Sequence, residues 1–433
     1  MSRIVVTGMG ILAPKFGTLD PTMQALIAGK SAVEPLQGTY FELLSTRIGG
    51  LIPNNILEEL LQHPSVARIS RRAFRPSKLA LAATLQALTQ AQLLDESDKI
   101  PMPLQTRTAA YIGTGVGPSE QVANVGKGLY RLKNAPHRQQ EQIHKEIARE
   151  HVATAMAGLP DSSAFQASQA FGIMGMIGCL IKACATGAGN IQLGAILLEG
   201  GYTDIAVCGG TESLGPNDVY PFSVYARNGA LSKRNHDPHG ASRPFDQDHD
   251  GFVPAEGAGI LVLETAQHAL LRGITPLAEL AGWGELSDAK GATDPDSSSQ
   301  AATILAALEK AGTSPEEVEV FVSHGTSTTA GDESELKAFK LIFNPERTFL
   351  TAPKSVTGHT LGATSAMQAI FGIEMIRRQL VPGILNLVNP IPEAQGLNLV
   401  QTTLHDKEIR TLVCNAAGFG GQNVCLVIKK WEE

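Results

Sequence analysis

The sequence predicts an α/β fold in which strands alternate with helices through two similar halves. Short β-branched stretches such as residues 4–10 and 318–322 end at glycine-rich or polar loops, which is typical of buried strands. Stretches with apolar residues at helical spacing, such as 76–94 and 362–377, lie between them. Because no Ser/Pro-rich linker interrupts this alternation, we expect one compact unit with largely parallel sheets.

The expected elements follow the alternation from one end of the chain to the other. In the first half we predict strands at residues 4–10, 109–117, 204–208 and 260–263, and helices at 76–94 and 189–198. In the second half we predict helices at residues 301–311 and 362–377, and strands at 318–322, 348–352, 411–414 and 424–429. The polar segment 288–299 is rich in Ser, Asp and Gly, which favours a long loop on the surface or lining a site.

Composition and charge narrow the class of protein. The chain has 433 residues, 43% of them hydrophobic and 18% charged, which is enough for a large core or two fused units. The net charge of −7 argues against general nucleic-acid binding, and the apolar run 170–181 is too short to cross a membrane. Five cysteines without paired spacing predict neither a disulfide scaffold nor a metal site. We therefore expect a cytoplasmic protein without a signal peptide.

One cysteine lies where an apolar run gives way to a helix. Cys184 sits among small residues in the stretch 182–187, and helical spacing begins directly after it. A thiol at a helix start faces unpaired N–H groups and the positive end of the helix dipole, which both favour the thiolate. The sequence thus offers Cys184 as a nucleophile, although a buried structural cysteine is the common alternative.

Other reactive groups follow predicted strands, where α/β folds place their sites. His324 lies in the Gly/Thr loop 323–328, and Lys354 and His359 belong to the next such loop. The glycines of residues 418–421 free backbone N–H groups to form an oxyanion hole. A lone histidine in such a loop is more often structural. Two of them, with a helix-capped cysteine and a polyglycine turn, favour thioester chemistry.

These motifs together resemble the β-ketoacyl-[acyl-carrier-protein] synthases of the thiolase fold, in particular the type I/II branch and its polyketide ketosynthase relatives. The resemblance covers nearly the full length and is carried by residues 5–10, 183–187, 243–246, 250–253, 324–328, 354–359 and 418–421. It implies two pseudo-repeated halves, residues 1–266 and 267–433, that form a five-layered αβαβα core. It also implies a homodimer, or a heterodimer with a subunit like a chain-length factor.

The resemblance also implies roles for individual residues. Cys184 corresponds to the acyl-accepting nucleophile, and its N–H with that of Phe419 to the oxyanion hole. His324 and His359 correspond to the pair that supports decarboxylation of the extender, with Lys354 as the charge that organises them. The remaining implied contacts are to the substrate: Thr326, Thr328, Phe419 as the gate, Val116 as a limit on chain length, and Ala417. No metal or other cofactor is implied, because the substrates travel on the phosphopantetheine arm of acyl carrier protein.

Several positions depart from the family pattern. The glutamate usually found fourteen residues after the lysine is Gln368 here, so we expect Lys354 to be held more loosely. Ala417 stands where an aromatic residue is common, which predicts a pocket or entrance for bulkier chains. Residues 121–152 are longer than in fatty-acid enzymes and rich in Lys and Arg, which suggests a docking face for an acidic carrier protein. These departures favour a polyketide or other specialised pathway over housekeeping fatty-acid synthesis.

Three functions remain open at this point. The first is an active condensing enzyme that extends a carrier-bound acyl chain with malonyl units. The second is an acyltransferase or cyclase that uses Cys184 without decarboxylation, which only Gln368 favours. The third is a chain-length partner in a ketosynthase heterodimer, which the intact Cys184 argues against.

Overall fold

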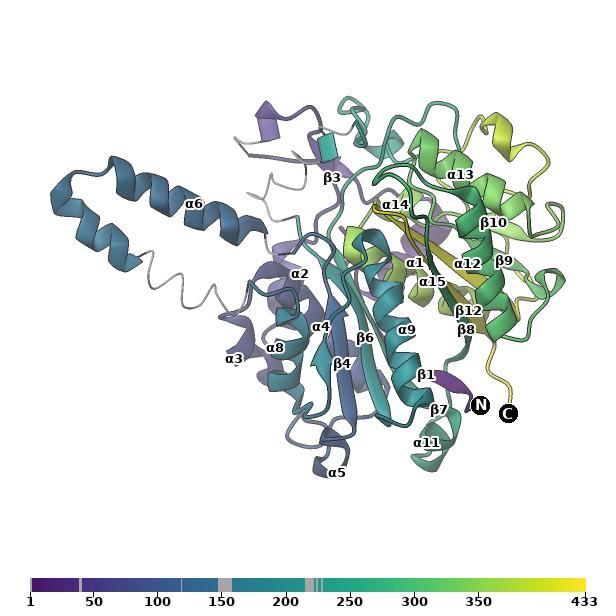
Figure 1. Ribbon diagram of the computed structural model, residues 1–433, viewed down its shortest axis with the longest axis horizontal. Helices are drawn as coiled ribbons and strands as arrows, with labels where there is room; N and C mark the ends of the chain where they lie inside the picture. The colour runs from purple at the N-terminus through teal and green to yellow at the C-terminus, as the bar shows by residue number, and fades with distance from the viewer. Residues whose placement is uncertain are drawn as a thin grey trace.

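Ten strands form the scaffold that carries the candidate site (Figure 1). The computed structural model describes residues 2–38, 41–117, 119–146, 158–214, 222, 225–226 and 229–433, with the backbone alone for 119–125. The strand order is β10-β9-β11-β12-β8-β1-β7-β6-β4-β5, so that two sets of five strands meet where β1 pairs with β8. The first set contains β1 (Ile4–Leu12), β4 (Thr108–Gly113), β5 (Ile177–Gly178), β6 (Ile205–Glu212) and β7 (Gly257–Thr265). The second contains β8 (Ala278–Ser287), β9 (Val320–Val322), β10 (Phe349–Thr351), β11 (Thr411–Gly418) and β12 (Gln422–Lys429).

The two sets have the same topology. The strands of each set are counted here in the order in which they follow along the chain. In each set the first strand pairs antiparallel with the fifth, and the fifth pairs antiparallel with the fourth. The fourth strand then runs parallel to the second, and the second parallel to the third. This repeated order is the pseudo-repeat of the thiolase-like fold, while the boundary between residues 266 and 267 stays a prediction.

The expectation of largely parallel sheets was wrong. Among the described residues, five of the nine neighbouring pairs in the ten-stranded sheet are antiparallel and four are parallel. Parallel neighbours need a crossover connection, whereas a short turn joins antiparallel strands. Strands β11 and β12 follow each other across a three-residue turn, so they must run antiparallel.

Six long helices complete the layers, three in each half. Helices α4 (Arg75–Gln90) and α8 (Ser162–Phe171) cover the outer face of the first five strands. Their counterparts α12 (Ser297–Lys310) and α13 (Thr329–Lys340) cover the outer face of the second five. Helices α9 (Thr186–Glu199) and α15 (Thr364–Arg378) contact each other and strands of both sets, so they form the central layer of an αβαβα arrangement.

The strands separate the layers by alternating their side chains between two cores. In β6, Ala206 and Cys208 face the central core with α9 and α15, whereas Ile205 and Val207 face the outer core with α4. All four are fully buried, as expected for a strand covered on both faces. The central helices therefore pack against strands of both sets and against each other, which fixes the position of their N-terminal turns.

The sequence located most of the long elements but missed four in the described chain. Strand β8 and helices α1 (Leu19–Ala28), α8 and α13 were not predicted, and the run before Cys184 contributes only the two residues of β5. Strand β8 contains two alanines and two glycines, residues of low strand propensity, which weakens its strand pattern. The remaining elements are β2 (Glu34–Pro35), β3 (Ile48–Gly49), α2 (Asn54–Leu60), α3 (Pro64–Ser70), α5 (Met102–Gln105), α11 (Ala266–Leu271) and α14 (Lys354–Thr357).

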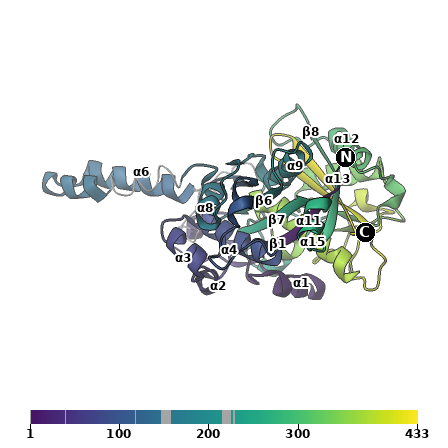
Figure 2. The ribbon, with the colours of Figure 1, turned by 90° about the horizontal axis from the view of Figure 1, so that it is seen from below.

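A helical arm leaves the body between β4 and α8 (Figures 1 and 2). It consists of α6 (Ser119–Asn134) and a second helical stretch, residues 137–146. The predicted exposed helices of residues 121–152 are thus present up to residue 146, and 147–152 lie outside the described residues. The basic residues Lys127, Arg131 and Lys133, called the arm's basic face below, are exposed. No helix in the described part of the chain is long and apolar enough to cross a membrane.

Candidate active site

Both central helices begin with the same strained turn. A 3-10 turn at Ala183–Ala185 leads into α9, and an equivalent turn at Leu361–Ala363 leads into α15. Ala183 and Leu361 each have φ of 45°, a left-handed conformation that side chains with a Cβ rarely adopt. These turns place Cys184 and the loop that follows His359 at neighbouring helix starts.

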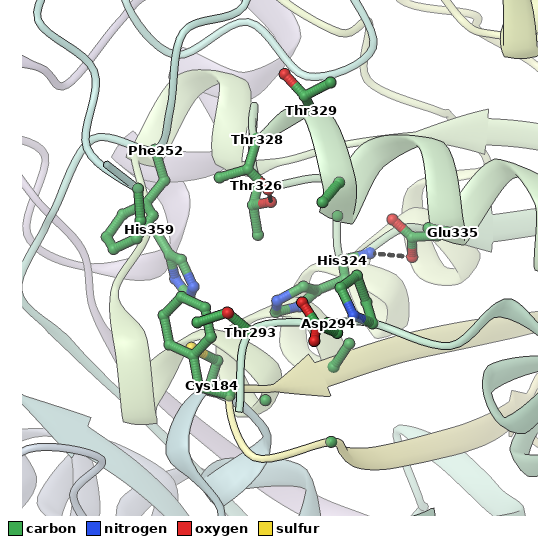
Figure 3. Close-up of a pocket in the computed structure, with 18 of the residues that line it drawn as sticks. Cys184, Phe252, Thr293, Asp294, His324, Thr326, Thr328, Thr329, Glu335 and His359 are labelled. Atoms are coloured by element: carbon green, nitrogen blue, oxygen red, sulfur yellow. Dashed lines mark hydrogen bonds between the residues drawn. The ribbon is translucent and has the colours of Figure 1, made fainter. Parts of the chain in front are cut away.

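Cys184, His324 and His359 converge at this point, as predicted (Figure 3). The sulfur and one nitrogen of each ring all lie within 4.8 Å of one another. The two imidazole rings are nearly perpendicular, at 86°, with centroids 5.5 Å apart. All three side chains are buried. The ring of Phe252 packs edge-on against that of His359, with the ring centroids 5.1 Å apart. One acyl thioester carbon can therefore reach the sulfur and both rings.

The hydrogen bonds on Nδ1 fix the protonation of both histidines. The backbone N–H of Leu361 donates to Nδ1 of His359 at 3.1 Å. The Lys354 ammonium has only donors, so it donates to Nδ1 of His324, 3.3 Å away. Each neutral ring must then carry its proton on Nε2. Burial, followed by the charge of Lys354, holds the pKa of both histidines well below the usual range, so both stay neutral.

These tautomers also bear on metal binding. A cysteine and two histidines at this spacing could in principle hold an ion. A neutral imidazole binds a metal through the nitrogen that carries no proton, and here that nitrogen is Nδ1, which already accepts a hydrogen bond. The buried ammonium of Lys354 also repels a cation. The cluster is therefore suited to donate hydrogen bonds.

Lys354 is held by three acceptors. Its Nζ donates to the backbone oxygen and Nδ1 of His324, and to Oε1 of Gln368 at 3.0 Å. The amide still accepts a hydrogen bond but brings no charge to the pair, and a looser hold on Lys354 than a glutamate would give stays a prediction. Burial lowers the pKa of Lys354, and the charge of Glu335 opposes this shift.

Glu335 belongs to the site and was missed by sequence reasoning. Its carboxylate accepts the N–H groups of His324 at 2.6 Å and Gly325 at 2.8 Å, and the side chain of Asn415 at 2.7 Å. Burial raises the pKa of Glu335, while these donors and Lys354 lower it. The glutamate lies in the middle of α13, a helix that the sequence analysis did not predict. Its three-residue spacing from Asp332 on the same helix was the available signal.

Asp332 holds the loop of residues 326–328, called the threonine loop below, in the same manner. It accepts the N–H groups of Thr326 at 2.9 Å and Ser327 at 3.1 Å. The hydroxyl oxygens of Thr326 and Thr328 lie 2.8 Å apart and line the cavity beside the histidines (Figure 3). The first two turns of α13 therefore shape both the histidine loop, through Glu335, and the predicted substrate contacts, through Asp332.

The environment of the Cys184 sulfur differs from the expectation. Burial raises the pKa of the Cys184 thiol to about 12, despite the lowering effects of Lys354 and of the backbone N–H groups of Phe419 and Cys184. The carboxylate of Glu212 raises this pKa further. Helix-start N–H groups do face the sulfur, as predicted, but desolvation outweighs them and the resting group is a thiol. The same two N–H groups are placed to bind an oxyanion.

Two different regions meet at Cys184. On one side a cavity of about 330 Å³ is lined by Thr326, Thr328 and Ala417. On the other side an apolar cluster contains Val116 and Phe222 and packs against the cysteine. Phe419 borders both regions and stacks on Tyr225 with ring centroids 5.8 Å apart. The structure thus brings every sequence-predicted site residue to one place, with Phe419 between the cavity and the apolar cluster.

The chain matches one family over most of its length. Residues 1–269 match the "Beta-ketoacyl synthase, N-terminal domain" and residues 277–388 the "Beta-ketoacyl synthase, C-terminal domain". Relatives include the 3-oxoacyl-[acyl-carrier-protein] synthases 2 of Staphylococcus aureus and Vibrio cholerae. Each is 32% identical to this chain and is aligned over 99% of both chains.

Solved structures agree with this assignment. A β-ketoacyl synthase from Burkholderia phymatum is 30% identical with a TM-score of 0.87, and the ishigamide ketosynthase/chain length factor is 26% identical with 0.85. A type II polyketide synthase acyl-carrier protein in complex with its ketosynthase is 25% identical, with a TM-score of 0.83. Each of these three alignments covers 100% of both chains. Fold and site define a condensing acyltransferase. The chain belongs to the β-ketoacyl synthase family.

Proposed function

We propose that this enzyme transfers an acyl chain to Cys184, decarboxylates malonyl-carrier protein, and joins the two by Claisen condensation. The observation that supports this most strongly is the cluster of Cys184, His324 and His359 within 4.8 Å, with Nε2–H of both rings available as donors. Two neutral donors beside a nucleophile suit a reaction that forms an enolate and then consumes it.

The first step loads the enzyme. The Cys184 sulfur attacks the carrier-bound thioester carbon, and the backbone N–H groups of Cys184 and Phe419 stabilise the tetrahedral oxyanion. Collapse breaks the bond to the phosphopantetheine sulfur, which leaves with the proton that the thiol gives up. Because the resting thiol has a raised pKa, the proton leaves during the attack and not before it.

The second step uses both histidines. Malonyl-carrier protein loses CO₂ when its C–C bond breaks, and the electron pair moves into an enolate whose oxygen accepts from Nε2–H of His324 and His359. The enolate carbon attacks the acyl carbon on Cys184, and the second oxyanion forms in the same pair of backbone N–H groups. Its collapse releases the β-ketoacyl-carrier product and the Cys184 thiolate, which regains a proton.

We further propose a polyketide or other specialised pathway. Ala417 leaves space beside the gate, and Gln368 and the long arm depart from the pattern of fatty-acid enzymes. By their titles, one structural neighbour is a ketosynthase/chain length factor and another is a type II polyketide synthase complex, although the sequence relatives named above are 3-oxoacyl synthases. The substrates would arrive on the phosphopantetheine arm of acyl carrier protein without another cofactor, in the cytoplasm, where Cys184 stays reduced.

A homodimer is the assembly we propose, formed through the edge of the sheet at β5. In the described chain β5 is the last strand, and it pairs with β4 alone. Apolar side chains gather beside this edge with unusual exposure: Met174 64%, Met176 39%, Ile177 38% and Ile181 49%. A heterodimer with a chain-length-factor-like subunit would use the same edge. The mass of the purified complex distinguishes a homodimer, with two copies of this chain, from a heterodimer with a second kind of subunit.

Intact mass measurement with acyl- and malonyl-carrier protein tests the reaction. The native enzyme should gain one acyl mass and release CO₂, and Cys184→Ala should gain none. His324→Ala and His359→Ala should still be acylated while CO₂ release falls by at least a hundredfold. Acylation without CO₂ release by the native protein would instead indicate an acyltransferase or cyclase. A native protein that is never acylated would be a chain-length partner.

A further inference from the structure

Gln368 bridges two groups that no single carboxylate could bridge. The Lys354 ammonium carries only donors, so it must face the amide oxygen, 3.0 Å away. The backbone oxygen of Ser323 is only an acceptor, so it must face the amide nitrogen, which donates to it. Gln368 is 2% exposed, and both of its hydrogen bonds are buried. The amide therefore matches its two neighbours in one orientation alone.

This bridge completes a clamp around the backbone of His324. Gln368 holds the carbonyl before the histidine, Lys354 holds the carbonyl and Nδ1 of the histidine itself, and Glu335 holds its N–H. Ser323 is fixed on its other side by bonds to the carbonyl of Thr351. A charged carboxylate at position 368 would leave the buried oxygen of Ser323 facing a second acceptor, which costs free energy.

The neutral amide also sets the charge balance of the site. The ionisable groups that act on Lys354 are Glu335, Cys184 and, more weakly, Asp332. Asp332 already accepts three backbone N–H groups and faces His249. Because position 368 adds no negative charge, one buried cation is opposed mainly by one buried carboxylate. The Lys354 ammonium lies 3.3 Å from Nδ1 of His324, and a nitrogen of that ring lies within 4.8 Å of the Cys184 sulfur, so the charge of Lys354 favours the thiolate there against burial and Glu212.

We propose that Gln368 is a positioning residue with two effects: its amide orients His324 through Ser323 and Lys354, and its neutrality leaves the charge of Lys354 free to assist ionisation of Cys184. The first effect rests on the function proposed above, because it appears in decarboxylation. The second does not, because any thiol reagent reports it. The groups that face Cys184 in this account are Lys354, Glu212 and the two neutral histidines.

The test measures alkylation of Cys184 by iodoacetamide from pH 6 to 10 in the full-length enzyme, read by peptide mass so that other cysteines do not contribute. Gln368→Glu adds a carboxylate, which stays ionised beside Lys354. It should slow alkylation about tenfold at every pH below the thiol pKa, equivalent to roughly one pKa unit. Gln368→Met removes the bridge without adding charge. It should alkylate within threefold of the native rate but release CO₂ from malonyl-carrier protein about tenfold more slowly.

Gln395→Glu adds the same charge at an exposed position and is the matched control. It should alkylate and decarboxylate as the native enzyme does. A Gln368→Glu profile that superimposes on the native one would overturn the electrostatic part, and native CO₂ release by Gln368→Met would overturn the positioning part. Loss of CO₂ release in the native enzyme itself would reject the proposed function and leave the alkylation result intact.

Discussion

A single methyl group added at Gly418, as in Gly418→Ala, should push the loop that carries Phe419 away from the nucleophile Cys184. A Cβ added there would lie 2.5 Å from the backbone oxygen of Lys182 and 3.4 Å from the backbone nitrogen of Cys184. Lys182 precedes the strained turn at Ala183, so its carbonyl cannot retreat cheaply. To reach an ordinary contact distance, the backbone at Gly418 and the backbone at Lys182 must move apart by roughly 1 Å. The N–H of Phe419, next along the chain, would move with the loop.

The size of the effect follows from the role of that N–H. It is one of two donors that face the Cys184 sulfur, and removal of one oxyanion donor typically costs about 100- to 1,000-fold in rate. A displacement of roughly 1 Å weakens the bond without abolishing it. We therefore expect Gly418→Ala to acylate Cys184 about 30- to 100-fold more slowly, which corresponds to roughly 2–3 kcal/mol.

The rate is measured by quenching the acylation reaction at successive times and determining the intact mass of the protein. Thermal unfolding reports whether the variant is folded. Gly420→Ala is the matched control, because it changes a glycine two residues further along, which has a left-handed φ of 84° where Gly418 belongs to strand β11. Its added Cβ would meet nothing closer than 3.8 Å. It should lose stability through strain while it retains most of the acylation rate. Native acylation by a folded Gly418→Ala protein would refute the assignment of Phe419 N–H to the oxyanion hole.

Three further predictions concern the surface, the channel and the threonine loop. Charge reversal of the arm's basic face should raise KM for carrier-bound substrate and spare a pantetheine thioester, and equal effects on both would exclude docking there. Ala417→Phe should slow acylation by the longest or stiffest chains at least tenfold, roughly 1.4 kcal/mol, and spare the shortest; uniform slowing would mean that Ala417 does not select chains. Burial is the largest influence on His249 and lowers its pKa, but the hydrogen bond to Asp332 and the charges of the nearby carboxylates together outweigh it, so the net shift is upward. With Asp246 and Glu333 also nearby, the stability from this pair should be full below about pH 6.5 and fall as pH rises through the folded pKa. Unfolding of His249→Arg across pH 5–9 should lack this fall, and parallel curves for both proteins would contradict it.

Much of the fold followed from local patterns, and the exceptions have physical causes. Strands that end in glycine loops were recognisable because they are buried on both faces and therefore rich in β-branched residues. Strand direction was not recognisable, because it depends on whether a crossover helix intervenes between neighbours in the sheet. The missed strand β8 carries glycines at 282 and 284, where an added Cβ would meet the backbone oxygens of Ala307 and Thr303 at 2.3 Å. Close helix packing, invisible in the sequence, thus explains why a strand here contains strand-weakening residues.

The candidate site was predictable in its reactive groups and unpredictable in its electrostatics. Cys184 and the two histidines are marked by the loops that hold them, and these loops have recognisable glycines and threonines. The thiol pKa depends on how much water the folded chain excludes, which no local pattern records. Glu335 lies on helix α13, which the sequence analysis did not predict, and the bond of Gln368 to Ser323 was not expected either. Both depend on hydrogen-bond geometry that is set by tertiary contacts between residues far apart in the chain.

The pseudo-repeat explains why this site can be assembled at all. Equivalent turns at Ala183 and Leu361 open the two central helices, and those helices pack against each other inside the molecule. One repeat places a nucleophile at its turn, and the other places His359 two residues before its own. The strain in both turns persists because α9 and α15 pack between the two five-strand sets of the sheet, and burial of the central core offsets its cost. A change that relaxed either turn would move one half of the chemistry away from the other, even if no reactive residue were altered.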